Sequence, residues 1–76
     1  MRELLEYLAR EIVDEPDAVE VTETEDDRGL LLSLRVAPED MGKVIGRGGR
    51  TARALRSVIR AAGTRKGVHA AVEIVG

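Results

Sequence analysis

The sequence predicts a single small α+β domain with the element order α-β-β-α-α-β. Two long segments carry apolar residues at helical spacing, and three others alternate apolar and polar residues as strands do. The length of 76 residues leaves room for one core only, and no internal repeat or low-complexity tract divides the chain. We therefore treat residues 1–76 as one domain.

The first element is predicted to be an amphipathic helix over Arg2 to Asp14. Charged residues separate its apolar positions, which are Leu4, Leu5, Leu8, Ile12 and Val13. Pro16 ends this helix, because its ring removes a backbone donor and clashes with the preceding turn. From Ala18 onward the pattern changes to alternation, which predicts a half-buried strand with an acidic far end.

A hairpin and a central strand follow. Glu25 to Gly29 reads as the connection, because Gly29 can adopt the positive φ of a tight turn. Leu30 to Ala37 is apolar on one face and partly apolar on the other, so we expect it to lie in the middle of the sheet. Pro38 then begins a short helix that runs to Ile45, with Glu39 and Asp40 opposing the positive end of its dipole.

The last elements are a helix and a strand. After Gly46 to Gly49, the segment Arg50 to Ala62 is rich in good helix formers, and Gly63 is expected just past its end. Thr64 to Gly67 reads as a loop. Val68 to Val75 alternates again and predicts the final strand.

Composition excludes several classes of protein. The chain has no cysteine and one histidine, so neither a disulfide framework nor a cysteine- or histidine-based metal centre can form. His69 has no evident catalytic partner, Thr51 and Ser57 have no base beside them, and the glycine-rich segment lacks the Gly-Lys-Ser/Thr ending of a nucleotide-binding loop. An enzyme and a bound cofactor are therefore not expected. With no apolar run long enough for a membrane span, we expect a cytoplasmic protein.

Charge is distributed unevenly along the chain. Residues 1–38 hold four basic and eleven acidic side chains, whereas residues 39–76 hold eight basic and three acidic ones. A local basic patch determines whether a protein binds a polyanion, so the overall charge of −2 does not exclude nucleic acid.

The helix after the glycines carries this patch. On a helical wheel one face is basic, formed by Arg50, Arg53, Arg56 and Arg60. The opposite face is the core face, formed by Ala52, Leu55, Val58, Ile59 and Ala62. No acidic residue interrupts the segment. A merely solvated surface remains the alternative interpretation of this feature taken alone.

The turn from Gly46 to Gly49 joins two helices. Without Cβ atoms, its backbone can approach a sugar-phosphate chain closely, and the start of the next helix faces phosphate oxygens. Lys43, Arg47 and Arg50 surround it with positive charge. Glycine also occurs in such turns for geometric reasons alone, so the turn gains meaning only from its basic context.

The segment Val44 to Arg50 resembles the GXXG signature of KH domains, which clamp about four nucleotides of single-stranded nucleic acid. The element order is similar to the type II arrangement, and the size is similar to the small bacterial KhpA (YlqC-like) family of RNA-binding proteins. The resemblance implies a three-stranded mixed sheet with Leu30 to Ala37 central and parallel to Val68 to Val75. It also implies three helices on one face of this sheet.

The resemblance also assigns residues to an RNA-binding site. Gly46 and Gly49 would be the fixed glycines, and Arg47 and Gly48 the pair that contacts the backbone of the RNA. An aliphatic groove would hold the bases, walled by Val44, Ile45 and Ala52. From the basic helix beside the glycine turn we further predict that phosphates are contacted by Lys43, Arg47, Arg50 and Arg53. Arg65 and Lys66 fall in the variable loop of the family, where RNA contact and a solvated loop are both open interpretations.

Two functions are therefore predicted. The first is a non-catalytic binder of single-stranded RNA, acting as a post-transcriptional regulator or an RNA chaperone. The alternative is a protein-interaction module that forms a homodimer or pairs with a larger KH-containing RNA-binding protein, with weak RNA binding of its own. The very small core motivates this alternative.

Overall fold

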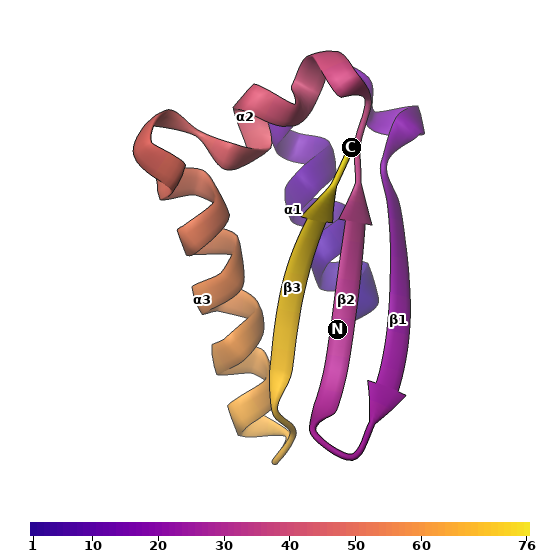
Figure 1. Ribbon diagram of the computed structural model, residues 1–76, viewed down its shortest axis with the longest axis vertical. Helices are drawn as coiled ribbons and strands as arrows, with labels where there is room; N and C mark the ends of the chain where they lie inside the picture. Colours follow the sequence, from indigo (N-terminus) through magenta and orange to yellow (C-terminus); the bar gives the residue numbers. More distant parts are fainter.

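The computed structural model describes the whole chain from Met1 to Gly76. Its main elements follow in the predicted order, so the α+β fold class is confirmed (Figure 1). They are α1 (Arg2–Ile12), β1 (Glu20–Asp26), β2 (Gly29–Arg35), α2 (Met41–Ile45), α3 (Arg50–Arg65) and β3 (Ala70–Val75). Single 3₁₀ turns occur at Pro16–Ala18, Pro38–Asp40 and Arg47–Gly49.

The three strands form one mixed sheet with β2 in the centre. β1 and β2 are antiparallel, and β2 and β3 are parallel, with Leu30 opposite Ala70 and Arg35 opposite Val75. A parallel pair requires a long crossover, which α2 and α3 provide. The expected mixed sheet and its central strand are both confirmed.

The hairpin connection is shorter than the sequence predicts. Glu25 pairs with Leu30 and Asp26 pairs with Gly29, so only two residues remain in the turn. β1 is an edge strand in which Val21 alone is buried, and an exposed edge tolerates acidic side chains. The acidic run that suggested a loop therefore belongs largely to the strand.

Gly29 brings the start of β2 against the residue before β3. Its φ is 133°, and a Cβ at this position would lie only 2.0 Å from the carbonyl oxygen of His69. That same oxygen accepts the backbone N–H of Leu30 at 2.8 Å. The absence of a side chain at Gly29 thus allows a close backbone contact as well as a positive φ.

The helices cover one face of the sheet and leave the other open, as expected (Figure 1). Side chains from α1, α2, α3 and the covered face form the core, and the largest fully buried apolar ones are Leu5, Leu32, Leu34, Val44 and Ile59. The open face carries polar rows, such as Thr22, Ser33 and Glu73. None of the helices combines the length and apolar character needed to cross a bilayer.

The end of α3 corrects one expectation. The helix continues through Gly63 to Arg65, and Gly63 is buried, with a Cβ placed there lying 2.7 Å from the carbonyl oxygen of Val68. The residue in the left-handed conformation after the helix is Gly67, at φ 73°. Its N–H donates to the carbonyl oxygen of Thr64, and the N–H of Val68 donates to the carbonyl oxygen of Gly63. This pair of bonds is a Schellman motif. Gly63 is therefore needed for close packing of the helix on β3.

Candidate nucleic-acid interface

A buried carboxylate holds the start of α2 in place. Asp40 is only 1% exposed, and its two oxygens accept the backbone N–H groups of Asp14 at 3.2 Å and Glu15 at 3.1 Å. Both donors follow α1, so Asp40 ties the end of one helix to the start of another. Asp40 also directly precedes α2, where the sequence places it against the helix dipole, but its hydrogen-bond partners lie far away along the chain, so this second role has no signal in the sequence.

The turn between α2 and α3 contains three glycines with positive φ. Gly46 has φ 74° and ψ 170°, a conformation that is essentially restricted to glycine. Gly48 and Gly49 have φ of 64° and 77° with ψ near zero, in the left-handed helical region. A Cβ at Gly46 would also lie 2.4 Å from Oγ1 of Thr51. The turn therefore depends on glycine for two different reasons, backbone conformation and space.

The tip of this turn is open to solvent. Arg47 and Gly48 are exposed, and nothing lies within 4 Å of a Cβ placed at Gly48 or Gly49. α3 begins directly afterwards, and no side chain caps its N-terminus. A phosphate backbone can therefore approach the main chain here without meeting a side chain other than arginine.

Exposed arginines extend from the turn along α3. Arg47, Arg50 and Arg53 are all exposed, and Arg56 and Arg60 continue the same face. Nε of Arg56 donates to the carbonyl oxygen of Val72 at 3.5 Å, so this guanidinium lies against the outer edge of β3. No acidic residue occurs in α3. The arrangement is a basic strip that begins at the glycine turn.

The ammonium of Lys43 is already paired with carboxylates of the protein. It forms a hydrogen-bonded ion pair with Asp14 and lies 4.0 Å from an oxygen of Asp40. The hydrogen bond to the Asp14 carboxylate raises the pKa of Lys43 above its usual value. Asp14 is exposed, so a phosphate would have to compete with it for this ammonium.

Comparison with known proteins supports a family assignment. Residues 2–74 match the model of the family described as KhpA/KhpB, KH domain. The RNA-binding protein KhpA of Clostridium acetobutylicum is 49% identical over 75 residues, covering 99% of this chain and 100% of that protein. The chain belongs to the KhpA/KhpB KH-domain family. The KhpA proteins of Streptomyces coelicolor, 55% identical over 65 residues (86% of this chain, 82% of that one), and Aquifex aeolicus, 43% identical over 75 residues (99% and 95%), are similar as well.

The aliphatic residues assigned to the groove of this KH domain have different exposures. Val44 is completely buried in the core and Ala52 is 4% exposed, whereas Ile45 is 40% exposed. Val44 therefore supports the interface from beneath and offers no surface to a base, because its side chain completes the core under α2. Ile45 is the aliphatic side chain of the three that reaches solvent.

Arg65 and Lys66 lie apart from the basic strip. They are exposed at the end of α3 and line a hollow with Leu4, Val58, Ala61 and Ala62, between α1 and α3. Arg56 and Arg60 instead line a hollow beside the start of β3. The KH domain therefore has basic residues on two sides of the same helix.

The set of residues assigned from the sequence omits part of the basic strip. Arg56 and Arg60 share the helix face of Arg53, and the helical wheel already indicates this, but only the fold places them beside β3. The partnership of Lys43 with Asp14 has no signal in the sequence, because the two residues are 29 positions apart.

Proposed function

We propose that this chain binds single-stranded RNA without catalysing a reaction, and that about four nucleotides lie along the turn from Gly46 to Gly49. One observation carries the proposal: an exposed turn whose glycine backbone is unobstructed leads directly into a helix with an exposed, all-basic face. The printed names of the relatives, RNA-binding protein KhpA, support the same assignment. Residues 1–76 act as one KH domain in this proposal.

The chemistry favours an unpaired strand. The backbone N–H groups near Gly48 and the guanidinium groups of Arg47, Arg50 and Arg53 bind phosphates, which fixes the strand but reads no sequence. Ile45 offers a small apolar surface to one base. The one aromatic residue, Tyr7, lies on α1 and provides no stacking platform at the turn. We therefore expect modest affinity and shallow base discrimination, which suits a post-transcriptional regulator or an RNA chaperone.

A titration at several salt concentrations tests the proposal. Labelled single-stranded RNA should bind saturably, and the logarithm of the association constant should fall against the logarithm of salt with a slope of about −2 to −3, since each phosphate contact contributes roughly 0.7. A hairpin-free duplex of the same sequence is the control and should bind more weakly. Equal binding of the duplex, or no saturable binding, would contradict the proposal.

A second candidate function is self-association through α1 and α3. The helical wheel places Val58 on the core face of α3, but the structure corrects this, because Val58 is 43% exposed and shares the apolar part of a hollow with Leu4, Ala61 and Ala62. An exposed apolar patch of this kind is typical of a protein contact. We propose that this surface forms a homodimer, or pairs with a larger KH-containing RNA-binding protein. The family description, which names both KhpA and KhpB, supports the second form.

Sedimentation measures this association directly. The chain should sediment as a dimer at tens of micromolar, and Val58→Lys should shift it to the monomer because a charge would be buried in the contact. Leu31→Lys, which changes an exposed apolar residue on the open face of the sheet, away from α1 and α3, is the control and should leave the mass unchanged. A wild-type monomer at this concentration would count against self-association.

A further inference from the structure

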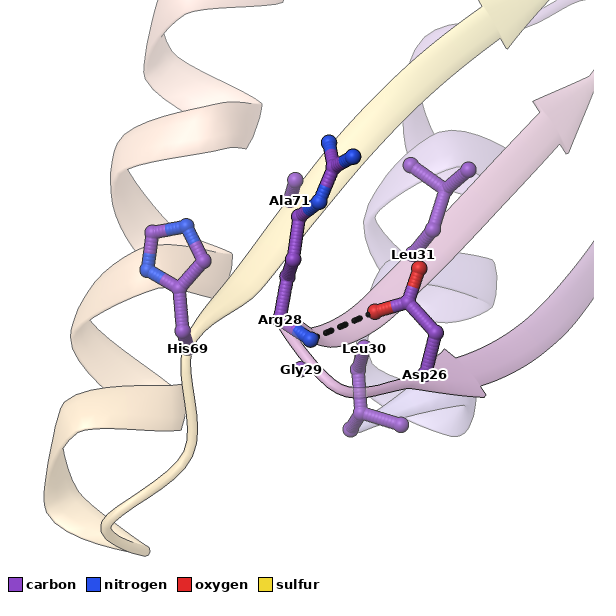
Figure 2. A pocket seen from close by; sticks show the side chains of 7 residues that line it. All are labelled: Asp26, Arg28, Gly29, Leu30, Leu31, His69 and Ala71. Carbon is purple, nitrogen blue, oxygen red and sulfur yellow. Dashed lines mark hydrogen bonds between the residues drawn. The ribbon is translucent and has the colours of Figure 1, made fainter.

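Two surface hollows meet at the start of β3. The first lies at the outer edge of the sheet and is lined by Arg56, Arg60 and the residues from His69 to Val72. The second lies towards the open face, at the hairpin end, and is lined by Asp26, the residues from Arg28 to Leu31, His69 and Ala71 (Figure 2). Because His69 and Ala71 line both hollows, the two lie next to each other around the edge of the sheet.

The two adjacent hollows lie at the far end of the basic strip that starts at the glycine turn. α3 runs away from the turn, and β3 begins near the opposite end of the helix (Figure 1). At 1.5 Å per residue, Arg50 and Arg60 are about 15 Å apart along the helix axis. A strand that leaves the turn and follows Arg53, Arg56 and Arg60 therefore arrives at His69.

The side chains at this point suit a nucleobase and a phosphate. The imidazole of His69 is exposed and has no hydrogen-bond or ion-pair partner, while its backbone is fixed by the bond from Leu30. Figure 2 shows the guanidinium of Arg28 extending beside β3 near Ala71, with the imidazole on the α3 side. Leu31, which is 38% exposed, and Ala71 add an apolar floor. Imidazole and guanidinium planes both stack with bases, and the guanidinium also binds phosphate.

Charge limits how far such a strand can extend. Asp26 lies in the second hollow, where one of its oxygens accepts the backbone N–H of Arg28 at 2.8 Å. Beyond it, the open-face positions of β1 are Thr22 and Thr24, which carry no positive charge, while Glu23 lies on the side of the sheet that α1 covers. The Asp26 carboxylate repels phosphate, so the favourable path ends near Arg28 and holds only one or two nucleotides.

We propose that single-stranded RNA longer than the four-nucleotide clamp continues past Arg56 and Arg60 onto the open face of the sheet, where a base stacks on His69 and a phosphate binds Arg28. This rests on the proposed function. It adds a second, extension site that uses the face of the sheet opposite the helices.

Oligonucleotide length separates the two sites. The affinities of a tetranucleotide and an octanucleotide are measured by anisotropy for wild type and for His69→Ala combined with Arg28→Ala. The double variant should bind the tetranucleotide as wild type does and the octanucleotide about tenfold more weakly. Comparing variant with wild type at each length cancels the statistical advantage of the longer strand.

Two further variants sharpen the result. His69→Phe should keep the affinity for the octanucleotide, because a stacking surface remains without the imidazole nitrogens. Tyr7→Ala with Arg10→Ala removes a ring and a guanidinium from exposed positions of α1, and should change neither affinity. Circular dichroism and thermal melting verify that each variant is folded.

The outcomes are distinguishable. An equal loss for both lengths in a folded variant would overturn the extension site by placing His69 and Arg28 within the clamp itself. No loss for either length would overturn the extension and leave the clamp intact. Failure of wild type to bind either oligonucleotide would overturn the clamp and the extension together.

Discussion

Replacing Arg47 and Gly48 together by aspartate is expected to weaken RNA binding by several kcal/mol, a hundredfold or more, while the fold stays intact. The change removes a guanidinium from the turn and places two carboxylates where phosphates are proposed to lie, so attraction becomes repulsion. Both positions are exposed and nothing lies within 4 Å of a Cβ at Gly48. The left-handed conformation there, φ 64° and ψ 19°, is one that aspartate tolerates better than most residues.

The measurement is RNA affinity together with circular dichroism and thermal melting. Arg10→Asp with Ala18→Asp is the matched control, because it changes the net charge by the same amount at exposed positions on α1 and in the 3₁₀ turn between α1 and β1. If binding depended only on overall charge, both double variants would weaken it equally. Unaltered binding by the variant at the turn would remove it from the interface.

Gly46→Ala is expected to destabilise the protein far more than Gly49→Ala. At Gly46 the φ of 74° with ψ of 170° is nearly exclusive to glycine, and the new Cβ would lie within 2.9 Å of both Cβ and the backbone nitrogen of Thr51. Backbone strain and overpacking of about 1–3 kcal/mol each add to a loss of roughly 2–6 kcal/mol. A chain of this length has a total stability of only about 4–11 kcal/mol.

Gly49→Ala provides the comparison within the same turn. Its φ of 77° and ψ of 14° are in the left-handed region, where an L-residue costs about 1–2 kcal/mol, and no atom lies within 4 Å of the new Cβ. Thermal or denaturant unfolding of the two variants measures the difference. Adding Thr51→Ala should not rescue Gly46→Ala, since the backbone nitrogen remains in the way. Equal losses for the two glycines would show that strain alone governs the turn.

Much of the fold could be predicted because its signals are local. Apolar spacing in Arg2 to Asp14 and alternation in Leu30 to Ala37 each report which face of an element is buried, and burial of that face largely stabilises the element. The exposed, basic character of Arg47, Arg50 and Arg53 follows from the same argument, because charged side chains on the face opposite the core remain in solvent.

The failures involve residues whose partners lie elsewhere in the chain. Gly63 looks like the end of a helix, yet its role is set by Val68 and Ala70, which come within 3.0 Å of where its Cβ would be. Val44 looks like part of a groove wall, and its complete burial becomes evident only when α2 docks on the core.

By itself the sequence determined the order of elements, the central strand, and the glycine turn followed by a basic helix, since each depends on the spacing of residues close together in the chain. Tertiary structure alone decided that Asp40 anchors the segment after α1, that Asp14 holds Lys43, and that His69 joins two hollows beside the arginines of α3. The physical reason is that hydrogen bonds, ion pairs and close packing act over a few ångströms in space, whatever the distance along the chain.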